Sequence, residues 1–148
     1  MIKILPKFTK ADIRRMIQQR KELFNELILQ NLQKVGEEFI ILARESGSYH
    51  DKSGNLRSSI GYVILRDGFQ FAGDGFVLIK KGGEGQKIGK KVIEEIARKY
   101  PTGWVLICVA GENYASAVEA KGFSVITPAA IEASQHLKTA MKRLSKKF

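Results

Sequence analysis

The chain has 148 residues, of which 44% are hydrophobic and 27% are charged, and its formal net charge at pH 7 is +10. This size and composition predict one compact domain, residues 1–148, and exclude wholesale disorder. The single cysteine, Cys108, excludes an intrachain disulfide, and no apolar run has the length of a signal peptide or a membrane span. We therefore expect a protein of the reducing cytoplasm, whose cationic surplus favours nucleic acid, an anionic membrane or an acidic partner.

The first 45 residues have the periodicity of a long helix. Thr9 and Asp12 form a capping-box pattern, and apolar residues recur at helical spacing from Ile13 to Ala43. Gly36 interrupts the segment, so two consecutive helices are the alternative to one long helix. Polar residues and glycines over 46–55 end the helical region.

Three short strands are expected next. Alternating residues predict a strand over 56–66, with Leu56 and Ile60 facing the core. A turn at 66–68 leads into a partner strand over 69–71. A further turn precedes a short apolar strand over 76–79, and together these segments predict an antiparallel meander.

A helix and a buried strand follow the meander. The spacing of Ile88, Val92 and Ile96 predicts a helix over 86–99. Residues 104–110 are nearly all apolar, which is typical of a strand that is covered on both faces or lies at the centre of a sheet.

The last part of the chain predicts a crossover, a strand and a closing helix. A short helix or irregular crossover is expected over 112–120 and a short strand over 123–126. Thr127 is the expected cap of the closing helix, whose apolar side consists of Ile131, Leu137, Met141 and Leu144. The predicted class is α+β: a long N-terminal helix, or two helices, and a C-terminal helix packed on a small, mainly antiparallel sheet, with one inserted helix.

The glycine-rich segment from Gly82 to Gly89 precedes the inserted helix. Backbone amides at a helix N-terminus attract phosphate, and the segment resembles the acetyl-coenzyme A loop of the GNAT acetyltransferases. The pattern fails at its diagnostic positions: Lys87 takes the place of the middle glycine when Gly89 is aligned as the last one. Glu84 would also repel a pyrophosphate. Because the match is incomplete, a GNAT-like acyltransferase that uses acetyl-coenzyme A is an alternative and not the main prediction.

No pattern predicts a catalytic residue, a cofactor or a metal site. The two histidines, His50 and His136, show no metal-ligand spacing. Cys108 lies in an apolar strand, where burial raises the pKa of a thiol and makes it a poor nucleophile. The basic stretch 138–147 has no interleaved aromatic residues, so a nonspecific basic DNA-binding module is a second alternative.

Two motifs indicate a structural protein. The first is Ser53-Gly54-Asn55-Leu56-Arg57-Ser58-Ser59-Ile60, and the second consists of Tyr114-Ala115 and Val118-Glu119 followed by Gly122. Together they resemble the paired signature of a tail-component family of long-tailed bacteriophages, over about residues 27–144. The chain departs from the family at Thr127-Pro128, which Ala129 follows in place of the usual phenylalanine.

The resemblance implies a non-enzymatic tail protein of a phage or prophage, which acts in head-tail joining or tail completion. Such proteins form homo-oligomeric rings around the DNA path, so the implied partners are further copies, other head-tail proteins and nonspecific DNA contacts, without a membrane. The implied address is the cytoplasm of the bacterial host and then the virion tail. The residues expected to serve structure and interaction are Gly54, Leu56, Arg57, Ile60, Tyr114, Glu119 and Gly122.

Two further hypotheses concern contacts of these motifs. Gly54 can take the positive φ of a turn, and Arg57 is free to reach a carboxylate, with Glu119 as the expected partner across the two motifs. A basic, glycine-rich loop after the meander is the candidate assembly segment. Its residues are Lys80, Lys81, Gly82, Gly83 and Gly85.

Overall fold

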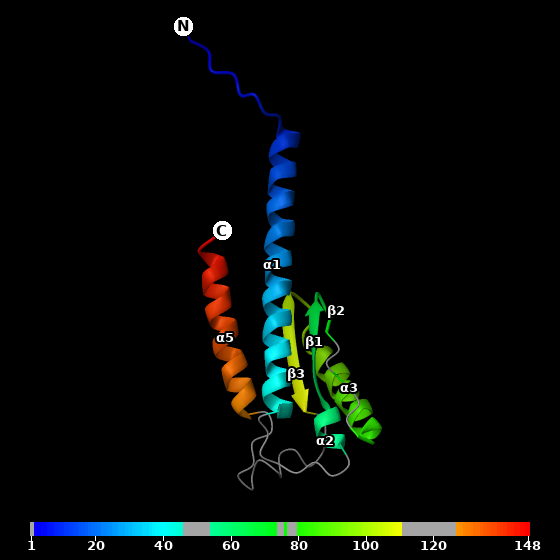
Figure 1. Ribbon diagram of the computed structural model, residues 1–148. Coiled ribbons are helices and arrows are strands. Elements are labelled where there is room, and N and C mark those ends of the chain that lie inside the picture. Colours follow the sequence, from blue (N-terminus) through cyan, green and yellow to red (C-terminus); the bar gives the residue numbers. More distant parts are fainter. Residues whose placement is uncertain (1, 46–53, 74–75, 77–79, 111–126) are drawn as a thin grey trace.

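The computed structural model describes residues 2–45, 54–73, 76, 80–110 and 127–148 (Figure 1). Its fold is α+β, as the sequence predicts, with a long N-terminal helix, a C-terminal helix, an antiparallel sheet and one inserted helix. In chain order the elements are α1 (Lys10–Glu45), α2 (Asn55–Ser58), β1 (Ile60–Arg66), β2 (Phe69–Ala72), α3 (Gly83–Ala97), β3 (Trp104–Ala110) and α5 (Thr127–Ser145).

The elements lie in four layers. α5 packs along α1, α1 covers one face of the sheet, and α3 covers the opposite face (Figure 1). β1 is buried on both faces, because Ile60, Tyr62 and Ile64 belong to the core under α1, while Val63 and Leu65 belong to the core under α3. The sheet is therefore the wall between two apolar cores.

The strand order is β2-β1-β3, and both pairs are antiparallel. Asp67 and Gly68 connect β1 to β2 with φ angles of 51° and 83°, which is the geometry of a tight two-residue hairpin turn. The predicted hairpin is confirmed. β3 pairs along the whole of β1, from Ile60 opposite Ala110 to Arg66 opposite Trp104. In the described sheet β3 is an outer strand, so its apolar run reflects coverage by α1 and α3 on its two faces and not a central position.

The strand expected over 56–66 begins later than predicted. Gly54 has a φ of 80°, and the amides of Ser58 and Ser59 donate to the carbonyls of Gly54 and Asn55, so this stretch forms the helical turn α2. Leu56 nevertheless faces the core, and its side chain is fully buried. Of the strand expected over 76–79 the structure describes only Phe76, and the expected elements over 112–120 and 123–126 lie outside the described residues.

α1 is one continuous helix of 36 residues, so the alternative of two helices broken at Gly36 is wrong. A Cβ atom at Gly36 would lie 2.5 Å from Cδ2 of Tyr62, so the missing side chain allows β1 to approach the helix closely. The capping box is confirmed: the amide of Thr9 donates to Oδ2 of Asp12 at 2.8 Å, and the amide of Asp12 donates to Oγ1 of Thr9 at 3.2 Å.

The closing helix differs from the prediction in its first turns. Ile131 is 57% exposed, whereas Ala129 and Ala133 are buried against α1. Alanines bring the two helix backbones close at this end, and larger side chains would separate them. The rest of the prediction is confirmed, because Leu137 and Met141 pack against the core and Leu144 is buried.

Candidate functional site

The first motif is built into the interior of the protein. Leu56, Ser58, Ser59 and Ile60 have no exposed surface, and the Ser59 hydroxyl donates to the carbonyl of Leu56 at 2.7 Å. The motif thus forms the junction between α1, β1 and α3, and these four side chains do not face a substrate.

Arg44 and Arg57 join the C-terminus of α1 to the first motif. Nε of Arg57 donates to the carbonyl of Arg44 at 3.1 Å, and Nε of Arg44 donates to the carbonyl of Arg57 at 3.2 Å. Nη2 of Arg44 also donates to the carbonyl of Ile60 at 2.7 Å. The last carbonyls of a helix have no partner within the helix, so the guanidinium of Arg57 satisfies one of them and complements the negative end of the helix dipole.

The glycine-rich segment packs on this same junction. Gly82, Gly85 and Gly89 are buried, and a Cβ atom at Gly85 would lie 1.9 Å from the carbonyl oxygen of Asn55. The amide of Gly85, in the first turn of α3, donates to Oδ1 of Asn55 at 3.3 Å. The glycines therefore allow close packing of α3 on the first motif, and a side chain of that motif accepts from the helix terminus.

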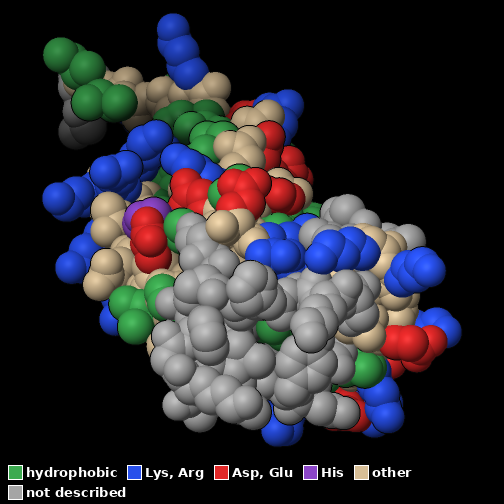
Figure 2. Space-filling view, turned by 60° about the horizontal axis from the view of Figure 1, so that its bottom comes forward, with side chains coloured by type: hydrophobic (Ala, Val, Ile, Leu, Met, Phe, Trp, Pro, Cys, Tyr) green, Lys and Arg blue, Asp and Glu red, His purple; other side chains and the backbone are tan. Residues whose placement is uncertain are grey.

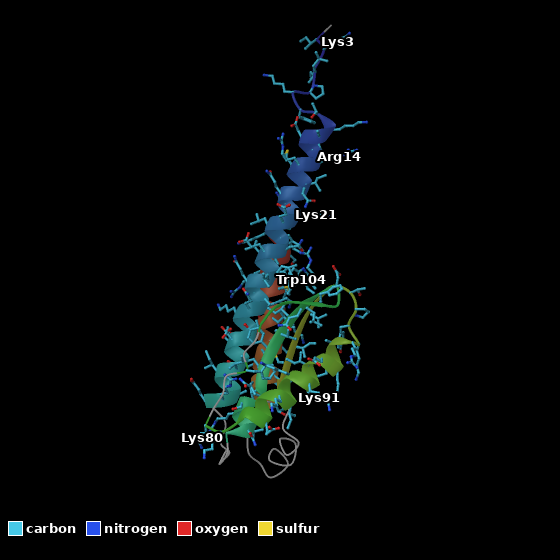
Figure 3. All side chains as sticks on the ribbon, turned by 90° about the vertical axis from the view of Figure 1, so that its right-hand side faces the viewer. Lys3, Arg14, Lys21, Lys80, Lys91 and Trp104 are labelled. Carbon is cyan, nitrogen blue, oxygen red and sulfur yellow. The ribbon has the colours of Figure 1, made fainter. Side chains whose placement is uncertain are left out.

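The expected assembly loop is shorter than predicted. Gly83 and Gly85 belong to α3, which begins three residues earlier than the sequence indicated, because the missing side chains let the first turn of α3 pack on α2. Gly82 is buried as well, and a Cβ atom there would lie 2.2 Å from Oγ of Ser58. Lys80 (Figure 3) and Lys81 are exposed in the turn before α3. Their role in assembly stays a prediction.

The second motif cannot be placed beside the first. Tyr114, Glu119 and Gly122 lie outside the described residues, so the ion pair between Arg57 and Glu119 stays a hypothesis. Among the described residues, Arg57 donates to the carbonyl of Arg44.

The projection of α1 was not predicted from the sequence. The N-terminal part of this helix extends past the sheet and past the end of α5 (Figure 1). Met16 is 66% exposed and Ile17 is 56% exposed, although their periodicity suggested a core-facing helix. Length was the available signal: 36 helical residues span about 54 Å, whereas a seven-residue strand spans about 23 Å.

A groove of about 380 Å³ lies between α1 and α5. On its wall, Nδ1 of His136 lies 2.7 Å from Oε2 of Glu38, which joins the two helices. Within the described part of the chain, no group of histidine, cysteine and acidic side chains could hold a metal ion. The residues that line the groove are Leu27, Asn31, Lys34, Val35, Glu38, His136, Thr139, Ala140, Arg143, Leu144 and Lys147.

Burial sets the acidity of two groups in the core under α1. Removal from water raises the pKa of the Cys108 thiol to about 12, as expected for a cysteine in an apolar strand. Burial also raises the pKa of the Tyr62 hydroxyl, which donates to Oε1 of Glu37 at 2.7 Å. At neutral pH the thiol is thus protonated and unreactive.

These shifts predict a loss of stability at alkaline pH. Cys108 ionises near its ordinary pKa of 9.0 in the unfolded chain but near 12 in the folded protein. Its contribution to stability is therefore complete below pH 9 and is lost as the pH rises to 12, with a slope of about 1.4 kcal/mol per pH unit. In urea titrations over this range, the free energy of unfolding should fall more steeply for the natural protein than for Cys108→Ala. Parallel slopes would contradict the burial of this thiol.

Comparison with known proteins yields no relative: no protein-family model, no curated protein and no solved structure matches the chain. Among the described residues, no helix has both the length and the apolar character needed to cross a membrane.

Proposed function

We propose that the protein is a non-enzymatic structural component of a phage or prophage tail, which acts in head-tail joining or tail completion as a homo-oligomeric ring around the DNA path. The observation that carries the proposal is the position of the first motif. Its residues Leu56, Ser58 and Ile60 are fully buried at the junction of three elements, as a scaffold motif requires. The α+β architecture is also the one that the family resemblance implies.

The charge distribution supports a passive contact with DNA. The net charge is +10, and Figure 2 shows lysines and arginines dispersed over one face, with acidic side chains between them. Dispersed cations attract phosphates without reading bases, and the attraction weakens as salt increases. Such a surface suits a protein that surrounds a DNA path.

Ring formation can be tested with the full chain. Native mass spectrometry and negative-stain electron microscopy are applied to the protein alone and after mixing with the purified neighbouring tail proteins. We expect closed rings of one copy number. The variant Lys80→Glu with Lys81→Glu tests the candidate assembly segment, because both side chains are exposed and both residues precede α3. Monomers under all these conditions would contradict the proposal.

Acetyl-coenzyme A should not bind. The amide of Gly85 already donates to Asn55, and Gly82 and Gly85 are covered by the first motif. A ligand present at a hundred times its dissociation constant stabilises a protein by about 2.7 kcal/mol. We therefore expect the same unfolding temperature with and without millimolar acetyl-coenzyme A. A rise that Gly85→Ala abolishes would instead support the acyltransferase alternative.

A further inference from the structure

We infer that the projecting helix, defined as residues 10–23 of α1, docks on another protein of the assembly that presents an apolar groove with an acidic rim. This inference rests on the proposed function, because it names the partner surface of an assembly protein. The projecting helix has an exposed apolar stripe, a cationic stripe along one edge of it, and a conformation that is already ordered.

The apolar stripe continues, beyond the end of α5, the side of α1 that lines the groove towards α5. Phe148 marks the boundary, because its ring packs edge-to-face on Phe24 at 5.1 Å and lies under the guanidinium of Arg20 at 5.2 Å. Beyond it, Ile13 is 42% exposed, Met16 66% and Ile17 56%. Residues three and four apart share one face of a helix, which is the spacing of anchors that enter a groove.

A cationic stripe runs along one edge of these apolar residues. Lys10, Arg14 and Lys21 are spaced four and seven residues apart and so share a side of the helix, where Figure 3 labels Arg14 and Lys21. No ion pair holds any of the three within the described part of the chain. The opposite side carries Gln19, Glu22, and Asp12 with its ion-pair partner Arg15. The surface is therefore asymmetric in charge.

The projecting helix is ordered before it binds. The capping box of Thr9 and Asp12 closes its N-terminus, and Gln18 Nε2 donates to Oε1 of Glu22 at 2.9 Å one turn apart. α1 continues without a break into the folded body, so the helix needs no separate nucleation. A preformed helix loses little conformational entropy when a partner covers it.

Charge and asymmetry favour an acidic protein over other occupants. Residues 2–21 contain seven cations and one acidic residue, hence +6 of the total charge of +10, so two such helices repel each other. DNA would engage the cations but leave the apolar stripe exposed to water. A helix lying in a membrane surface keeps basic side chains over its polar face, whereas Lys10, Arg14 and Lys21 follow one edge of the apolar stripe. An acidic rim beside an apolar groove matches both stripes.

The test measures binding of the full chain to a synthetic amphipathic helix with leucines on one face and glutamates along one edge. Met16→Ser with Ile17→Ser removes the apolar stripe, and Arg14→Glu with Lys21→Glu reverses the cationic one. Gln18→Ser with Gln19→Ser is the matched control in the same turns. All six positions are exposed, so circular dichroism should show unchanged helix content. We expect each of the first two pairs to weaken binding at least tenfold, and the control to bind like the natural protein.

Other outcomes would overturn the inference. They are the absence of peptide binding, binding that the serine pair leaves unchanged, stronger binding to phosphatidylglycerol vesicles or to duplex DNA than to the peptide, and concentration-dependent dimers that the serine pair abolishes. The ring experiment is independent of this one, because a failure to form rings leaves peptide binding measurable. If the protein forms rings but does not bind the peptide, the docking role of the projecting helix is contradicted and the proposed ring is not.

Discussion

Replacing Gly85 with alanine is expected to destabilise the protein by about 2–3 kcal/mol, although alanine is the better helix former. The reason is a backbone contact: the added Cβ atom would lie 1.9 Å from the carbonyl oxygen of Asn55. α3 must then move away from α2, which opens the core that contains Phe76 and Ile93. Urea denaturation measures the difference in the free energy of unfolding.

Lys87→Ala serves as the control for this substitution. It lies in the same part of α3, its side chain is 78% exposed, and it pairs with Glu84 at the surface. Its effect should stay within about 0.5 kcal/mol. If Gly85→Ala were as stable as the natural protein, α3 would not pack on the first motif as described.

Arg57→Met is expected to cost about 1.5–3 kcal/mol of stability. Methionine keeps much of the length of the side chain but donates no hydrogen bond, so the carbonyl of Arg44 at the end of α1 loses a charged donor. Because the two arginines bind each other's carbonyls, the combined variant Arg44→Met with Arg57→Met should cost less than the sum of the single changes. Strict additivity in the double-mutant cycle would show that the contacts are independent.

The same design tests the hypothesis that joins the two motifs. Charges are swapped at Arg57 and Glu119, singly and together. A double change that restores stability lost in the single changes indicates coupling. If all three variants are equally damaged, Arg57 and Glu119 are not coupled and the ion pair is absent.

The sequence was sufficient where local rules decide the structure. The capping box at Thr9, the hairpin turn at Asp67 and the apolar run of β3 all depend on neighbouring residues, and the structure confirms each of them. Gly36 and Gly85 were misinterpreted for a common reason. At Gly36 the ring of Tyr62 packs where a side chain would lie, and at Gly85 the backbone of Asn55 does so. Tyr62 and Asn55 belong to other segments, so the periodicity of one segment cannot predict these contacts.

In the candidate site, too, features that depend on one segment were predicted and contacts between segments were not. The burial of Leu56 and Ile60 followed from their apolar character, whereas the pairing of Arg44 with Arg57 required two segments to meet. The exposure of Met16 and Ile17 could not be predicted from periodicity, because an apolar stripe looks alike whether the protein itself or a partner covers it. Only the length of α1, which exceeds that of the strands it covers, indicates that its N-terminal part extends beyond the sheet.

The proposed function implies that a phage or prophage encodes the protein. Deletion of the gene from that genome tests the central claim most directly, with electron microscopy of the particles as the readout. If the protein joins heads to tails or completes tails, the deletion should yield separate heads and tails, and the natural gene supplied in trans should restore joined virions. Complementation by the variant Met16→Ser with Ile17→Ser should fail, and complementation by Gln18→Ser with Gln19→Ser should succeed. Intact, infectious virions in the absence of the gene would contradict the account.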